Sequence, residues 1–93
     1  MKIEMTVGMY VGLRGVPGDV DGDRPALNKF NRVVGLYMRE LHVARHGAPS
    51  DIMVDLGHGQ KVKAYGERDH DLLDLAYDLA VIAWRELVEK DDF

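Results

Sequence analysis

Residues 23–47 read DRPALNKFNRVVGLYMRELHVARHG, and this stretch decides the fold. Asp23 is suited to cap a helix, Pro25 is favoured in a first helical turn, and Gly47 is typical of the residue that ends a helix. Apolar residues recur at helical spacing on one side, which predicts an amphipathic helix over 24–46. That side consists of Ala26, Leu27, Phe30, Val33, Val34, Tyr37, Leu41 and Ala44. The opposite stripe consists of Arg24, Asn28, Asn31, Arg32, Gly35, Arg39, His42 and His46.

Three further elements surround this helix. Apolar residues at every second position from Ile3 to Leu13 predict a strand over 2–14. After the helix, two alternating stretches separated by Gly57-His58-Gly59 predict a β-hairpin over 51–65. A second helix is expected over 69–90, with Asp69 as its N-cap and acidic residues in its first turn.

The order β-α-β-β-α predicts an α+β fold. Because each strand has only one apolar side, we expect a three-stranded sheet with both helices packed on one face. A chain of 93 residues is expected to form a single domain, 1–93. The sequence leaves the strand order open.

Composition excludes several kinds of chemistry. The chain has no Cys, which excludes disulfides, a thiolate nucleophile and cysteine metal sites. Ser50 is its only serine and Thr6 its only threonine, so a serine hydrolase has little to use. The longest apolar run, Leu79 to Trp84, is too short for a membrane span. We therefore expect a cytoplasmic protein that contacts no membrane, is not an enzyme and has no cofactor.

The second helix is apolar around most of its circumference, more than a helix covering a small sheet needs. Three interpretations stay open. The helix could lie centrally between the sheet and the first helix, with the small residues Ala76, Ala80 and Ala83 allowing close approach. It could carry a homodimer face, or a groove for a different protein. The residues predicted for a partner or dimer interface are Tyr77, Val81, Trp84 and Val88.

Charge is unevenly distributed along the chain, whose net charge is −4. Residues 24–46 hold five bases and one acid, whereas residues 67–93 hold three bases and nine acids. Attraction between the two helices explains this pattern, and so does a surface that binds an acidic partner or nucleic acid. The residues predicted for such a surface are Arg24, Arg32, Arg39, His42 and His46.

His42 and His46 lie four residues apart, so one helix face carries both. This spacing can hold a divalent metal if His58 or His70 supplies a third ligand. The sequence nevertheless favours an exposed histidine pair and no metal. The loop 19–23 resembles the start of a calcium loop, but Arg24 and Phe30 occupy positions that require Gly and an acid.

These observations predict a small, non-enzymatic protein–protein interaction domain that binds a second copy of itself and another protein. Small, acidic, cysteine-free chains without motifs are common among phage and mobile-element accessory proteins that bind and inhibit or modulate host proteins. The alternative is a small nucleic-acid-binding regulator. It would use the basic first helix or an open sheet face on which Tyr10 and Tyr65 stand among bases.

Overall fold

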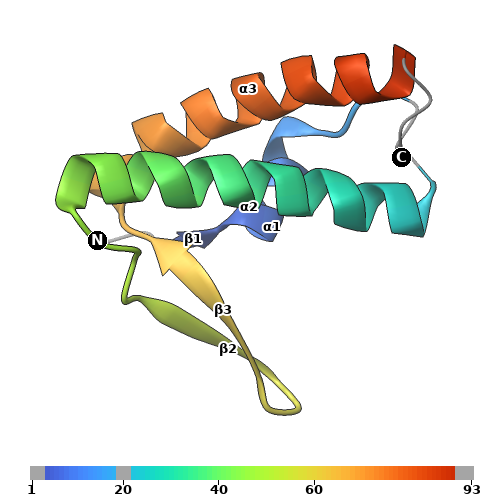
Figure 1. Ribbon diagram of the computed structural model, residues 1–93. Helices are drawn as coiled ribbons and strands as arrows, with labels where there is room; N and C mark the ends of the chain where they lie inside the picture. Colours follow the sequence, from blue (N-terminus) through green and yellow to red (C-terminus); the bar gives the residue numbers. More distant parts are fainter. Residues whose placement is uncertain (1–3, 19–21, 90–93) are drawn as a thin grey trace.

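Within residues 4–18 and 22–89, three α-helices lie together and a β-hairpin extends away from them (Figure 1). The computed structural model describes residues 4–18 and 22–89. Over these residues the elements are β1 (Met5–Thr6), α1 (Val7–Arg14), α2 (Arg24–His46), β2 (Met53–Gly57), β3 (Gln60–Tyr65), the short 3₁₀ turn η1 (Glu67–Asp69) and α3 (His70–Glu89). The expected α+β class is confirmed. The expected arrangement of two helices on one sheet face is not matched, because a third helix is present and the hairpin projects past the helices.

The predicted strand over 2–14 is wrong for most of its length. Only Met5 and Thr6 are in a strand, and the chain then turns into α1, while residues 2 and 3 lie outside the described part. The Thr6 hydroxyl caps this helix by accepting a hydrogen bond from the Met9 amide at 3.1 Å. The helix buries adjacent residues, Tyr10 and Val11, instead of every second one. Leu13, which a strand would bury, is 75% exposed.

Helix α1 is held against α3 by its last turn. The Tyr10 hydroxyl donates a hydrogen bond to the Asp74 carboxylate, and Arg14 Nη1 donates to the Tyr10 oxygen at 2.7 Å. The Arg14 guanidinium also lies 4.3 Å from the centre of the Tyr77 ring and 3.3 Å from Asp78. The acidic stripe of α3 is therefore used in part to bind the arginine of α1.

Helix α2 has the bounds that the sequence predicts, from Arg24 to His46. The Asp23 side chain accepts a hydrogen bond from the Ala26 amide, and Gly47 adopts the left-handed conformation with φ of 80°. The buried face, however, is rotated from the predicted one and consists of Phe30, Val34, Met38 and His42. This row at four-residue spacing faces the rest of the core, whereas the expected core residue Ala44 is exposed.

Helix α3 runs antiparallel to α2 and forms most of the core with it (Figure 1). Ala76 and Ala80 are fully buried, and Trp84 packs edge to face on Phe30 with 5.8 Å between ring centres. Because α3 also contacts α1, apolar side chains are buried around a wide part of its circumference. The predicted central position of this helix is thus matched on the side of α2, but α1 packs on α3 where the sheet was predicted. Within residues 4–18 and 22–89, no helix is long and apolar enough to cross a membrane.

The sheet has the order β1-β3-β2, and both pairings are antiparallel. The hairpin forms as predicted, since Gly57 pairs with Gln60 and leaves the two-residue turn His58-Gly59. Both turn residues have positive φ, 53° and 76°, which is the conformation that two-residue hairpin turns favour. The Ser50 hydroxyl fixes the base of the hairpin by donating to the Ala64 carbonyl oxygen at 2.7 Å.

Candidate functional site

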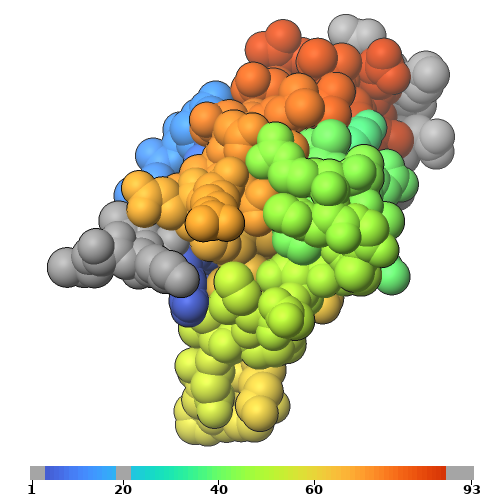
Figure 2. Space-filling model, turned by 90° about the vertical axis from the view of Figure 1, so that its left-hand side faces the viewer, coloured from blue at the N-terminus to red at the C-terminus, as the bar shows by residue number. Residues whose placement is uncertain are grey.

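Two histidines and one aspartate meet where α2 ends and α3 begins. His42 and His46 lie one turn apart on α2, and Asp69 lies in η1, immediately before α3. Figure 2 shows this end of the molecule, where the C-terminal turns of α2 (green) lie beside the start of α3 (orange). His46 Nε2 is 2.9 Å from Asp69 Oδ1, and His42 Nε2 is 3.7 Å from Asp69 Oδ2. One carboxylate therefore faces both rings.

Beside this cluster, Arg45 contacts two carboxylates. Arg45 forms two hydrogen bonds with the Asp71 carboxylate, at 2.9 and 2.7 Å, and a longer one of 3.3 Å with Asp69. Burial by itself raises the pKa of Asp69, but hydrogen bonds from His46 and Arg45 outweigh burial and lower that pKa. The hydrogen bond from Arg45 also lowers the pKa of Asp71. Both carboxylates are accordingly ionised at neutral pH.

The predicted basic stripe is not a single surface. Arg24, Arg32 and Arg39 are exposed on α2, as expected. His42, expected in solvent, is buried at 9% exposure because its ring lies against Tyr65 and its Nδ1 is 2.7 Å from the Ala48 carbonyl oxygen. His46 is half-exposed but is bound to Asp69. Burial thus removes His42 from the predicted stripe, so the prediction of an exposed histidine pair is wrong for His42, whereas His46 is exposed.

Arg32 and Arg39 line a hollow of about 450 Å³ between α2 and the sheet, together with Lys63 of β3. Tyr65 lies in the same hollow and is almost fully buried, which raises its pKa even though Arg39 acts in the opposite direction. The open sheet face that the sequence suggests is absent from the described residues, because Tyr10 and Tyr65 are both in the core. Neither ring is free to stack on an unpaired base.

Three of the four residues predicted for an interface on the second helix have described side chains, and these three belong to the core or pack against it. Trp84 is 1% exposed, so it cannot contact another chain in this conformation. Tyr77 and Val81 pack against the core, and the Tyr77 hydroxyl donates to the Gly15 carbonyl oxygen at 2.7 Å. The side chain of Val88 lies outside the described part of the chain.

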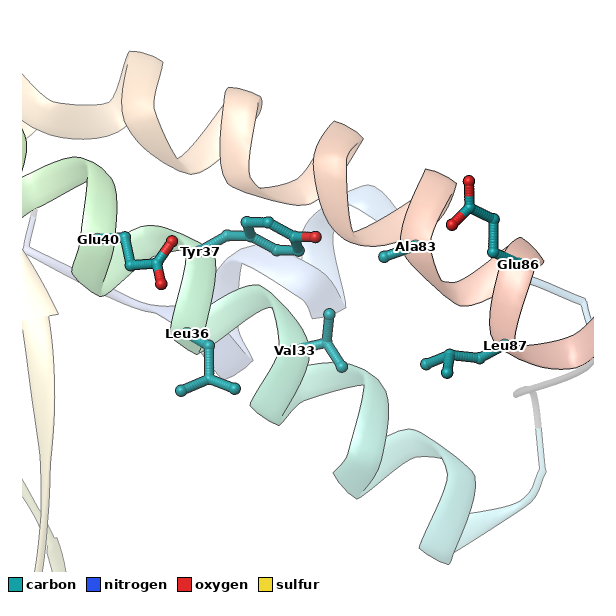
Figure 3. A pocket seen from close by; sticks show the side chains of 7 residues that line it. All are labelled: Val33, Leu36, Tyr37, Glu40, Ala83, Glu86 and Leu87. Carbon is teal, nitrogen blue, oxygen red and sulfur yellow. The ribbon is translucent and has the colours of Figure 1, made fainter. Parts of the chain in front are cut away.

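An apolar groove instead runs between α2 and the C-terminal half of α3 (Figure 3). It has a volume of about 570 Å³ and is lined by Val33, Leu36, Tyr37, Glu40, Ala83, Glu86 and Leu87. Val33 and Leu87 point toward each other across it, while Leu36 projects from α2 away from α3 (Figure 3). A second hollow on the other side of Leu36 is lined by Arg39, Glu40, Val43 and Ala44. Leu36, 59% exposed, thus forms a ridge between two hollows.

Sequence reasoning missed two residues of these sites. Asp69 was expected to cap the second helix, but its carboxylate binds His46 and Arg45. Neither His58 nor His70 joins the two histidines in the one group of candidate metal ligands found in the described residues. Neither of the two faces predicted for the helix over 24–46 includes Leu36. The sequence does indicate an exposed apolar position here, because Leu36 is a large apolar residue between the charged residues Arg32 and Glu40.

No protein family, no curated protein and no solved structure matches this chain in sequence or fold comparisons.

Proposed function

We propose that this protein is a non-enzymatic protein–protein interaction domain and that its first partner is a second copy of itself. The observation that carries this proposal is the Leu36 ridge with a hollow on either side. Complete burial of an exposed leucine is worth roughly 1.5–3 kcal/mol, and Leu36, which is 59% exposed, would gain about half of that against an opposing chain. The cytoplasmic location and the binding of a further, host protein are carried over from the sequence as predictions.

The charges around Leu36 are self-complementary. Arg32 precedes Leu36 by four residues and Glu40 follows it by four, so they flank it about 6 Å away along the axis of α2. Both are exposed, and neither belongs to an ion pair found within residues 4–18 and 22–89. If two α2 helices cross antiparallel at Leu36, each Arg32 faces the partner's Glu40. A parallel crossing opposes like charges.

The same crossing fits the shape of the surface. A two-fold axis beside Leu36 places the leucine of each copy against a hollow of the other, as a knob enters a hole in paired helices. Val43 lies on the same stripe of α2 and is also exposed, so it extends the apolar contact. The proposal moves the homodimer face from the second predicted helix to α2, because Trp84 is part of the core.

Leu36→Asp is expected to convert the dimer to a monomer. The wild-type protein should show twice the chain mass of 10.5 kDa in light scattering after gel filtration, and the variant should show a single chain mass. The introduced carboxylate loses its water in the apolar contact, which costs several kcal/mol. Ile82→Asp is the matched control, because Ile82 is 57% exposed on α3 and lies outside the groove; this variant should remain dimeric.

A charge exchange tests the orientation. Glu40→Arg alone should weaken the dimer, since it brings two positive charges together at each end of the contact. Adding Arg32→Glu in the same chain should restore it. A wild-type protein that is monomeric at about 0.1 mM, a concentration at which weak dimers of micromolar affinity form, contradicts the proposal. Failure of the exchange to restore the dimer contradicts the antiparallel crossing.

Nucleic-acid binding is a second candidate function, and it is favoured by the hollow that Arg32, Arg39 and Lys63 share. Phosphate groups bind such clusters of bases most tightly at low salt. Arg39→Ala should weaken a low-salt gel shift of mixed-sequence RNA or duplex DNA. Arg24→Ala should leave it unchanged, because Arg24 lies on α2 but outside the hollow. The absence of any shift with the wild-type protein removes this candidate.

A further inference from the structure

We propose that His42, His46 and Asp69 bind a divalent transition-metal ion of the zinc class. This inference is independent of the dimer, because the three residues lie at the junction of α2 and η1 and do not line the groove beside Leu36. Each residue offers one ligand atom, and these atoms all lie within 4.8 Å of one another.

The distances are close to those of a bound ion. Zinc ligands lie roughly 2.0–2.2 Å from the metal, so donors in a tetrahedral site are about 3.4 Å apart. His42 Nε2 and Asp69 Oδ2 are already 3.7 Å apart, and the rings of His42 and His46 have centres 4.3 Å apart. Because the three donor atoms lie within 4.8 Å of one another, the half-exposed His46 side chain has to move by about 1–2 Å to place them around one ion.

The second nitrogen of His42 is fixed in the way that metal-binding histidines usually are. His42 Nδ1 lies 2.7 Å from the Ala48 carbonyl oxygen, which only accepts hydrogen bonds. Nδ1 must therefore donate that hydrogen bond, which leaves Nε2, the nitrogen that faces Asp69, as the one that can bind a metal. Such a bond to a backbone carbonyl orients the ring and selects the ligating nitrogen. Burial of His42 between α2 and Tyr65 holds this orientation.

Arg45, which lies next to the three ligands, does not occupy the Asp69 oxygen that would bind the ion. Arg45 is bound by two short hydrogen bonds to Asp71 and contacts Asp69 only at 3.3 Å. Asp69 Oδ2 is not the oxygen that Arg45 contacts, so it stays available for the metal. The positive charge of Arg45 lowers the affinity of the site, and we expect micromolar binding in place of the tighter binding of sites without such a neighbour.

The donor set selects the class of metal. Two imidazole nitrogens and one carboxylate oxygen suit Zn²⁺, Co²⁺ and Ni²⁺, whereas Ca²⁺ and Mg²⁺ prefer sites made of oxygen. Three protein ligands leave at least one coordination position for water or another molecule. A bound ion also ties the end of α2 to the start of α3, so it should raise thermal stability.

Zn²⁺ added to tag-free wild-type protein at a hundredfold excess over its Kd is expected to raise Tm by about 10 °C or more. Mg²⁺ at the same concentration should not. His46→Ala should abolish most of the Zn²⁺-dependent shift and weaken Co²⁺ binding, followed by visible absorption, by at least about tenfold. His46 is half-exposed, so this variant should keep the wild-type fold, which circular dichroism checks.

His58→Asn is the matched control, because it removes a histidine from the hairpin tip and Asn tolerates the positive φ there. This variant should bind Zn²⁺ and Co²⁺ like the wild type. Asp69→Asn replaces the carboxylate ligand by a neutral amide and should also reduce Co²⁺ binding. The proposal is overturned if Zn²⁺ up to about 1 mM leaves the wild-type Tm unchanged, or if His46→Ala binds Co²⁺ as tightly as the control.

Discussion

Replacing Trp84 with Ala should lower the free energy of unfolding by about 3–5 kcal/mol. Trp84 is the largest of the fully buried side chains and packs edge to face on Phe30. Its removal leaves a cavity between α2 and α3, and the loss includes both the burial of the ring and the contacts of the cavity walls. Urea unfolding followed by circular dichroism measures the effect, because Trp84 is the only tryptophan and the variant lacks its fluorescence.

The matched control is Ile82→Ala, two residues away on the same helix. Ile82 is 57% exposed, so the variant should lose less than about 1 kcal/mol. This pair of variants also separates the interpretation of α3 as a core helix from the two in which its residues form an interface. If Trp84 were an interface anchor, its variant would dissociate a dimer and keep the stability of the single chain. That result contradicts the core that Trp84 forms with Phe30.

Replacing Gly8 and Gly12 with Ala in one chain should raise the free energy of unfolding by about 1–2 kcal/mol. Each glycine inside a helix costs about 0.5–1 kcal/mol relative to alanine. A Cβ at Gly8 would have Thr6 Oγ1 at 4.0 Å as its nearest contact, and one at Gly12 would have no heavy atom within 4 Å. The double variant therefore gains helix propensity at no steric cost. Thermal and urea unfolding both measure the gain.

Gly15→Ala is the opposite control, since Gly15 ends α1 with φ of 91° and alanine is strained there. It should lose stability while the double variant gains it. A double variant that is less stable than the wild type indicates that residues 7–14 are extended, as the alternating pattern suggests. The pair of measurements thus tests the largest difference between the sequence prediction and the structure.

That difference has a physical cause. Over eight residues, apolar side chains at every second position also supply apolar side chains at helical spacing, so Val7 and Val11 fit both patterns. Contacts with α3 decide between them, because only a helix brings Tyr10 and Arg14 together onto Asp74. By contrast, α2 and the hairpin were predictable because their boundaries rest on local signals. Asp23, Gly47 and the two-residue turn act within their own segments.

The candidate site was predictable only in part, for a similar reason. The four-residue spacing placed His42 and His46 on one face of a helix, and they do lie together. The helix pattern did not fix the rotation of α2, because Met38 adds an apolar position that turns the buried face toward His42. The meeting with Asp69 depends on how α2 and α3 pack, and nothing local to either segment encodes that distance.

The hairpin that projects from the helices offers a site for attaching a label or an affinity tag. Its tip, His58-Gly59, lies far from the α2–α3 core, and most of β2 is exposed (Figure 1). Loop tips of this kind accept inserted sequence better than any packed segment. A fluorescent label or an affinity peptide inserted there keeps the Leu36 ridge and the His42–Asp69 junction accessible. Both surfaces can then be studied in the same tethered molecule.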